Sequence, residues 1–466
     1  MTHESLGPGR VIPPTKVAPA AVPPAQSRRG VRLGPVAVLI VVLLAVMTGL
    51  LSLVVPGTLF ERDAGRLAAA VTFAASYVAL AVGRVPGLAI DRAGVALVGA
   101  SLMVASGALP LDEAYKAIDL DTLTLLLGMM ILVANLRLSG FFAMTGGWVM
   151  RRAHRPLALL AAVAATAGVF SAFLVNDAVC LVLAPLVIEL TLALRRNPVP
   201  YLLAVAMASN IGSTATITGN PQNMMIGSFS HIPYANFAAA LAPVALFGLL
   251  LTIILIALFH RHEFARGARL TAPSTPIRLH RVLMWRALAG TALVISLFFA
   301  GQPPAKVAII VGELLLTRRV RSERVYAQID WSLLLMFAGL FIIVAGAEHS
   351  LLSGEVIAAA GQLHLGRLPV LSAMTAILSN LVSNVPAVVV LRPFIEGLRD
   401  QERAWLTVAM ASTLAGNLTV LGSIANLIVV QRAAASGIVI GLWDYCRVGV
   451  PLALLTLAIG TLWLWI

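Results

Sequence analysis

Long apolar segments are the feature that most constrains this chain. Stretches of about 20 residues with almost no charge recur along it, and one helix of that length crosses the hydrocarbon core of a bilayer. Of the 466 residues, 59% are hydrophobic and only 11% are charged, whereas a soluble domain carries about 25% charged residues. We therefore expect an all-α polytopic membrane protein whose first partner is the lipid bilayer.

The apolar segments divide into ordinary spans and two longer stretches. The predicted spans are residues 35–56, 65–83, 93–109, 121–138, 199–229, 237–259, 286–301, 304–317, 330–347, 404–431 and 448–466. The stretches 156–194 and 369–395 fit either two crossings or a re-entrant hairpin, because both arrangements return to the same side. Residues 1–34 are rich in Pro and Gly, so we expect a disordered tail before the N-terminal spans of 35–83.

The basic charge indicates topology. The net charge of +13 sits in a polytopic chain, where Lys and Arg mark the cytoplasmic side rather than a nucleic-acid partner. With a cytoplasmic N-terminus, most Lys and Arg fall inside, including Arg151, Arg152 and the loop 260–285. We predict a multi-pass protein of the inner (plasma) membrane with a cytoplasmic N-terminus and no nucleic-acid partner.

Enzyme signatures are missing from the sequence. Cys180 and Cys446 are too few for a disulfide framework or a Cys-rich metal site. No HExxH pair and no phosphate-cradling GxxxxGK[ST] motif occurs. We therefore predict that the protein is no enzyme and has no cofactor. Energy for transport would come from an ion gradient or from a partner subunit.

An internal repeat favours the hairpin interpretation of the two longer stretches. SAFLVNDAVCLVLAP (171–185) aligns without gaps on SNLVSNVPAVVVLRP (379–393), and ASNIGSTATITGNPQNMMI (208–226) aligns on ASTLAGNLTVLGSIANLIV (411–429). Upstream, Gly128 matches Gly339. The loop charges place the copies in opposite orientations, as in many secondary transporters.

The predicted architecture is therefore two inverted repeats, each with a re-entrant hairpin and an interrupted transmembrane helix. We expect repeat 1 at 84–259, a cytoplasmic linker at 260–285 and repeat 2 at 286–466. Binding sites in such proteins lie at the repeat interface near the middle of the membrane.

Polar side chains gather at the hairpin tips and at Gly- and Pro-rich breaks inside apolar spans. The candidate substrate- and ion-binding residues are Asn176, Asp177, Asn210, Ser213, Thr214, Thr216, Gly219, Asn220 and Asn223 in repeat 1 and Ser383, Asn384, Asn417, Thr419, Gly422 and Asn426 in repeat 2. Freed carbonyls with Asn, Ser and Thr oxygens suit a hard cation such as Na⁺, and freed amides at a half-helix N-terminus suit an anion. The alternative is close helix packing with interhelical hydrogen bonds.

Asp177 is the one acid at a hairpin tip. Its counterpart in the second copy is Val385, so the two halves are not chemically equivalent. An acid within an apolar span is costly and marks a candidate ligand for a proton or a cation. The alternative is that Asp177 caps the second helix of the hairpin.

At these residues the chain resembles a known superfamily. FLVNDAVCLVLAPLVI and ASNIGSTATITGNPQNMMIG are similar to segments of the ion transporter superfamily, which includes citrate and dicarboxylate symporters, the arsenite permease and some Na⁺/H⁺ antiporters. The resemblance covers roughly residues 80–466. It implies two hairpins whose tips meet two interrupted helices, a homodimer, and an elevator-like movement of the site.

The tips differ from the carboxylate branch of that superfamily. The carboxylate branch has a Ser-Asn-Thr signature at both tips. In this chain the tips are Val175-Asn176-Asp177 and Ser383-Asn384-Val385, so the Thr is missing from both. In this respect the chain is closer to the arsenite-permease-like members. The resemblance implies a secondary active transporter of a small inorganic or organic anion, with H⁺ or Na⁺ as coupling ion. The alternatives are a Na⁺/H⁺ antiporter of the same fold and, from another class, a passive channel or a membrane-embedded enzyme.

Overall fold

The structure is a computed structural model that describes residues 59–82, 90–152, 154–264, 279–316, 322–351 and 364–466. All regular structure in these ranges is helical, as the composition predicts. Seven of the described helices are long and apolar enough to cross a membrane. The predicted tail (1–34), the first predicted span (35–56) and the centre of the predicted linker (265–278) lie outside the described residues.

The helices follow the predicted spans closely. The first half of the chain forms α2 (Leu59–Val82), α3 (Arg92–Ala105), α4 (Leu111–Ala117), α5 (Leu120–Ser139), α6 (Phe141–Arg152), α7 (Pro156–Phe173), α8 (Asn176–Ala193), α9 (Pro198–Ser213), η1 (Ile217–Gly219), α10 (Pro221–Ser230), α11 (Tyr234–Phe259) and α12 (Arg261–Phe264). The second half forms α13 (Arg281–Phe299), α14 (Pro304–Leu315), α15 (Ser322–Tyr326), α16 (Trp331–Leu351), α18 (Leu368–Val382), α19 (Asn384–Glu396), α20 (Gln401–Ala415), η2 (Val420–Gly422), α21 (Ile424–Ala435) and α22 (Leu442–Trp465).

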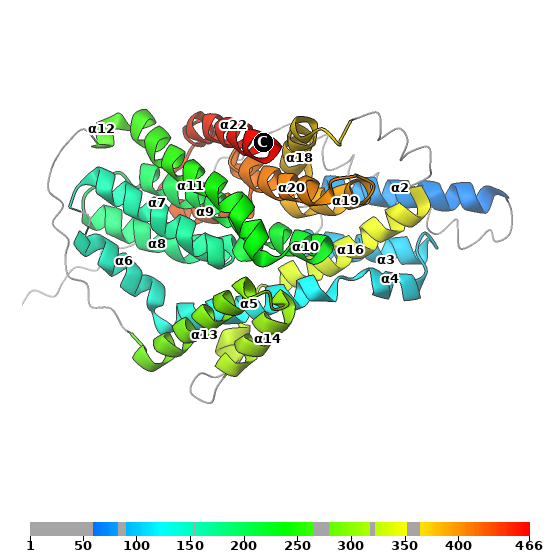
Figure 1. Cartoon of the computed structure of the whole chain (residues 1–466), viewed down its shortest axis with the longest axis horizontal. Helices are drawn as coiled ribbons and strands as arrows, with labels where there is room; N and C mark the ends of the chain where they lie inside the picture. The colour runs from blue at the N-terminus through cyan, green and yellow to red at the C-terminus, as the bar shows by residue number, and fades with distance from the viewer. Residues whose placement is uncertain (1–58, 83–89, 153, 265–278, 317–321, 352–363) are drawn as a thin grey trace, which may run out of the picture.

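The two repeats exchange helix partners. α5 packs against α13 and α14, whereas α16 packs against α2 and α3 (Figure 1). Gly128 on α5 and Gly339 on α16 lie at these crossings. A Cβ at Gly128 would meet the backbone of Ala308 at 2.4 Å, and one at Gly339 would meet the backbone of Ala96 at 2.6 Å. The two glycines that align in the sequence therefore make the same close contact in both repeats.

The longer apolar stretches are helical hairpins. α7 and α8 form the first, and α18 and α19 form the second. α8 packs on α21 and α19 packs on α10, so the second arm of each hairpin contacts the interrupted helix of the other repeat. The tip residues Asn176 and Asn384 are buried inside the protein. The fold is thus two inverted repeats with re-entrant hairpins, as predicted.

Each interrupted helix stops and restarts inside the protein. α9 ends at Ser213 and α10 starts at Pro221, whose missing N–H costs nothing at the first position of a helix. Asn220 caps α10, because its side-chain oxygen accepts from the backbone N–H of Asn223 at 2.9 Å. In repeat 2, α20 ends at Ala415 and α21 begins after its N-cap residue, Ser423. The predicted spans 199–229 and 404–431 therefore each contain a break.

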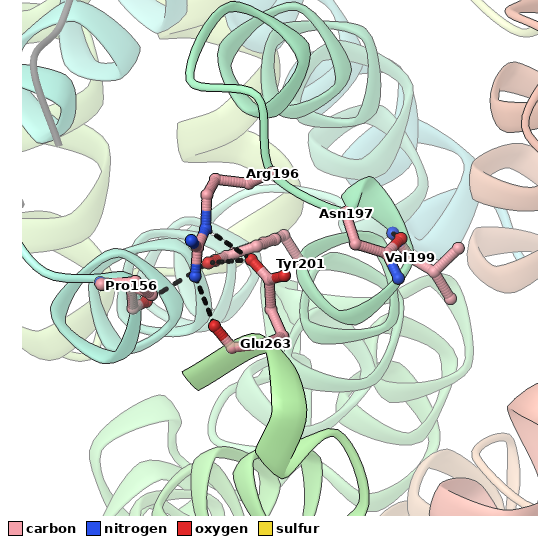
Figure 2. Close-up of polar contacts among 6 residues, drawn as sticks. All are labelled: Pro156, Arg196, Asn197, Val199, Tyr201 and Glu263. Atoms are coloured by element: carbon pink, nitrogen blue, oxygen red, sulfur yellow. Dashed lines mark hydrogen bonds and ion pairs between the residues drawn. The ribbon is translucent and has the colours of Figure 1, made fainter. Parts of the chain in front are cut away.

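A buried ion pair fixes the base of the first hairpin. Arg196, just after α8, donates from Nε to Oε1 of Glu263 in α12 at 2.7 Å, and the two side chains are only 11% and 15% exposed. The Tyr201 hydroxyl, on α9, donates to the same oxygen at 3.3 Å. Figure 2 shows these side chains converging on Glu263. The contact joins the ends of three helices.

Candidate functional site

The hairpin tips and helix breaks form one polar cluster in the protein interior. The candidate residues that are buried are Asn176, Asn210, Ser213, Thr214, Thr216, Gly219, Asn220, Asn223, Asn384, Asn417, Gly422 and Asn426. Asp177, Ser383 and Thr419 are half-buried. Because buried polar groups are costly without partners, the hydrogen bonds of this cluster define its geometry.

At each break an equivalent asparagine bonds to two backbone carbonyls, an arrangement that we call the asparagine clamp. Asn223 donates from Nδ2 to the carbonyl oxygens of Ser213 at 3.1 Å and Thr216 at 3.0 Å. The equivalent Asn426 donates to the carbonyl oxygens of Gly416 at 2.7 Å and Thr419 at 3.2 Å. Each clamp bonds carbonyls near the end of its first half-helix, where intrahelical partners run out. The similarity between the two repeats therefore includes individual hydrogen bonds.

Asn210 connects the two repeats. Its Nδ2 donates to Oδ1 of Asn417 at 2.9 Å and to Oδ1 of Asn426 at 3.0 Å, both on the other break. Its Oδ1 accepts from Nδ2 of Asn176 at 3.2 Å and from the hydroxyl of Ser423 at 3.0 Å. One side chain thus contacts the first hairpin tip and both ends of the second break.

Thr413 makes the reciprocal connection from repeat 2. Its hydroxyl accepts from Nδ2 of Asn220 at 3.1 Å and from Nε2 of Gln222 at 3.2 Å. The sequence already places Gln222 and Thr413 among the polar residues of the two interrupted spans, and the alignment sets Thr413 opposite Asn210.

Asn384 brings the second hairpin tip into the same cluster. With its amide nitrogen facing the acceptors, it donates to the carbonyl oxygens of Ser412 at 3.1 Å and Gly422 at 3.2 Å, and its oxygen accepts from Nε2 of Gln222 at 3.1 Å. Ser379, on the first arm, also donates to the carbonyl of Ser412 at 3.0 Å. The structure therefore brings Asn176 and Asn384 to the same pair of breaks from opposite repeats.

Glycine is required where the breaks fold back. A Cβ at Gly219 would lie 2.1 Å from the carbonyl oxygen of Ser213, and a Cβ at Gly422 would lie 2.8 Å from that of Gly416. These two candidates shape the loops and offer no side-chain ligand. Thr419 contributes its carbonyl to the Asn426 clamp.

The remaining repeat 1 candidates bond to nearby backbone. The hydroxyls of Ser213 and Thr214 donate to the carbonyl of Asn210 at 2.8 Å and 3.2 Å. The Thr216 hydroxyl donates to the carbonyl of Ala172, in the first arm of hairpin 1. These bonds hold the break against the hairpin.

Asp177 differs from its neighbours because it makes no hydrogen bond or ion pair with any described residue. It lies in the first turn of α8, but the N-cap residue is Val175 and no side chain caps that helix. The capping role that the sequence left open is therefore not what the structure shows.

The cluster offers two kinds of ligand group. Asn176 Oδ1 in the cluster and Ser171 Oγ near the end of α7 are buried and have no hydrogen-bond partner among the described residues, so they are oxygen ligands suited to a hard cation. No group of three or more His, Cys, Asp and Glu residues that could hold a metal occurs in the described part of the chain. The N-termini of α8, α10, α19 and α21 all carry residues of the cluster, and helix N-termini favour anions.

Comparison with known proteins identifies the family. A family model described as a citrate transporter matches residues 77–415. This chain belongs to the citrate transporter family. An uncharacterised transporter of Mycobacterium bovis is 28% identical over 426 residues, covering 85% of this chain and 97% of the relative. The silicon efflux transporter LSI3 of Oryza sativa is 29% identical over 449 residues, covering 81% of this chain and 93% of the relative.

A solved structure supports the fold. The crystal structure of the YdaH transporter of Alcanivorax borkumensis superposes with a TM-score of 0.57 at 16% identity, covering 92% of this chain and 97% of that chain. At this identity the likeness concerns the fold alone. Together the family match and the seven apolar helices establish a multi-pass membrane transporter and confirm the resemblance found in the sequence.

Proposed function

We propose that this family member is a secondary active transporter of a small inorganic or organic anion, coupled to H⁺ or Na⁺. The observation that carries the proposal is the cluster in which Asn210 bonds to the first hairpin tip and the second break, while Gln222 on the first break bonds to Thr413 and to Asn384 at the second tip. A solute held there contacts both repeats, so a movement of the tips and breaks carries it from one side to the other.

The anion part of the proposal rests on helix N-termini. No Lys or Arg takes part in the hydrogen bonds of the cluster described above, so the positive potential there comes from the amides at the starts of α8, α10, α19 and α21. Such amides recognise a compact anion by its oxygen atoms. Citrate, from the family description, is therefore the first anion to test, and silicic acid, from the silicon in the name of the relative in Oryza sativa, is the uncharged solute to compare with it.

The coupling part rests on Asp177. An ionised Asp177 beside the cluster repels an anion, and a proton on its carboxylate or a Na⁺ ion next to it removes that repulsion. Na⁺ would find further ligands in Ser171 Oγ and Asn176 Oδ1. Because linkage is reciprocal, the bound anion raises the affinity for the cation by the same factor.

The test is transport by purified full-length protein in proteoliposomes. Uptake of citrate and of silicic acid is measured under an imposed pH gradient or Na⁺ gradient. We expect Asp177→Asn to retain downhill solute exchange and to lose accumulation driven by the cation gradient. Asp112→Asn serves as the control, because this carboxylate on α4 is 72% exposed and far along the chain from the cluster.

Three results would contradict the proposal. Unchanged gradient-driven accumulation in Asp177→Asn would show that this residue does not couple transport. Proton movement evoked by Na⁺ without any anion would indicate the antiporter alternative. Flux that neither saturates nor responds to a gradient would indicate a channel.

A further inference from the structure

A second polar region lies where α11 ends and α22 begins, away from the hairpin tips. A cavity of about 650 Å³ opens there, and its lining includes Arg261, Arg447, His260 and Glu263. α11 belongs to repeat 1 and α22 to repeat 2, and the two helices pack against each other. The proposed transport function does not use this cavity.

Two guanidinium groups bring positive charge to the cavity lining. Arg447 donates from Nη2 to the carbonyl of Phe259 at 2.9 Å, and its guanidinium lies 5.4 Å from the centre of the Phe259 ring. Arg261 is exposed and makes no hydrogen bond or ion pair with a described residue. The one acid among the lining residues, Glu263, is bonded to Arg196 instead (Figure 2).

His260 adds a polar group without adding charge. Its Nδ1 is buried and lacks a well-aligned hydrogen-bond partner among the described residues. Burial, and to a smaller degree the charge of Arg447, lowers the pKa of His260 below its usual value, while the backbone of Ile256, Asp444 and Glu263 act in the opposite direction. The imidazole is therefore neutral at pH 7, and the attraction for an anion rests on the two arginines.

Apolar side chains continue directly from the cavity along the helices. Leu258, which lines the cavity, is 63% exposed, and Ile254, one turn deeper on the same face of α11, is 48% exposed. On α22, Leu454 is 56% exposed two turns beyond Arg447. A cationic cavity above a strip of exposed apolar side chains matches a molecule with an anionic head and hydrocarbon chains.

We propose that this cavity binds the phosphate group of an anionic membrane phospholipid, with Arg261 and Arg447 contacting the phosphate and the acyl chains lying along Ile254 and Leu258. Arginine suits this role because its fork of N–H donors matches two phosphate oxygens at once. Free phosphate shares the head chemistry but has no group for the apolar strip, so the complete surface fits the lipid. A lipid bound here contacts both repeats.

The experiment uses the full-length protein in detergent micelles. Phosphatidylglycerol, phosphatidylcholine and inorganic phosphate are titrated separately, with bound lipid counted by native mass spectrometry and the thermal midpoint measured in parallel. We expect phosphatidylglycerol to bind and to raise the midpoint, and the other two to do so much less. Arg261→Gln should weaken phosphatidylglycerol binding roughly tenfold, as expected for the loss of one charge-assisted contact.

The controls separate a site from general charge attraction. Arg281→Gln removes the same charge from an exposed position at the start of α13, outside the cavity lining, and should bind lipid as the parent protein does. Arg261 makes no hydrogen bond or ion pair with the residues that the structure describes, and circular dichroism with gel filtration checks that its replacement keeps the fold. Arg261→Gln with Arg447→Gln should remove the phosphatidylglycerol-dependent shift.

Two outcomes would overturn the inference. Equal phosphatidylglycerol binding by the parent protein and the double variant would show that the cavity is not the site. A shift produced equally by inorganic phosphate and by phosphatidylglycerol, and lost in the double variant, would assign the cavity to a free anion instead of a lipid.

Discussion

Asn210 shows how one residue holds the two repeats together. Its amide bonds to Asn176, Asn417, Asn426 and Ser423, and all of these side chains are buried. An amide that both donates and accepts suits a position where two inverted copies present the same residue type to each other. Removing the Asn210 amide leaves several buried side chains without a hydrogen-bond partner, in a site closed to bulk water.

Asn210→Ala should therefore destabilise the protein and abolish transport. Each buried partner left without a bond costs about 1–3 kcal/mol, so we expect the thermal midpoint in detergent to fall clearly. Asn236→Ala is the matched control, because Asn236 is exposed on α11 and should change the midpoint little. Equal midpoints for the two variants would contradict the proposed role of the network.

Ser383 carries backbone strain at the second tip. Its φ of 80° and ψ of 158° lie in a region that glycine alone enters easily. Ser383→Gly should raise the thermal midpoint, with a gain of about 1 kcal/mol after the entropy cost of glycine. Ser383→Ala should give no gain, because it keeps the Cβ. A midpoint that falls in Ser383→Gly would show that the hydroxyl matters more than the strain.

At the scale of secondary-structure elements, the main feature is the close crossing of helices. α5 packs closely on α14 and α16 packs closely on α3, and Gly128 and Gly339 allow this approach. Small residues are the usual means of close packing between helices in membranes, where apolar burial contributes little to association.

Gly128→Ala and Gly339→Ala should each destabilise the protein by about 1–3 kcal/mol through overpacking. Gly146→Ala, on α6, is the control, since its Cβ would meet nothing nearer than 3.9 Å and alanine favours a helix. Thermal unfolding of the three variants in the same detergent measures the effect. Similar midpoints for all three would mean that the crossings tolerate a larger separation.

At the scale of the whole molecule, a few long-range polar contacts tie distant segments together. The Arg196–Glu263 pair joins the base of the first hairpin to α12 and is mostly shielded from water. A shielded pair responds strongly to the loss of one partner, because the other charge stays behind without compensation.

Arg196→Gln should lower the free energy of unfolding by about 3 kcal/mol, and the double variant with Glu263→Gln should lose less than the sum of the single variants. Glu396→Gln provides the comparison, because the Arg392–Glu396 pair is 40% and 51% exposed and should contribute at most about 1 kcal/mol. Additive losses in the double variant would show that the pair is not coupled.

Much of the architecture could be predicted, because recurring features of the sequence indicate it directly. Apolar length indicated the spans, and aligned Asn, Gly and Ser residues indicated the hairpins and breaks. The alignment of Asn223 with Asn426 predicted two matched residues, and the structure shows that both bond to the backbone carbonyls of their own break. The homodimer, the cytoplasmic N-terminus and the repeat boundaries stay predictions.

Other contacts could not be anticipated from one sequence. Gln222 has no polar counterpart, because Ala425 stands at the aligned position, yet it bonds to Asn384 on the opposite hairpin. Arg196 and Glu263 carry no motif that would pair them across α9, α10 and α11. The cationic cavity likewise arises from residues of α12 and α22 that are far apart along the chain.

Membrane insertion, the inverted repeat and the location of the polar breaks follow from the amino-acid order, because hydrophobic length and internal similarity are local or aligned properties of a chain. The partners of Asn210, the isolation of Asp177 and the cavity at Arg261 follow from folding, because they depend on which helix faces cross. Those crossings bring residues about 200 positions apart within hydrogen-bond distance, as where α9 meets α20 and α21 and Asn210 bonds to Asn417.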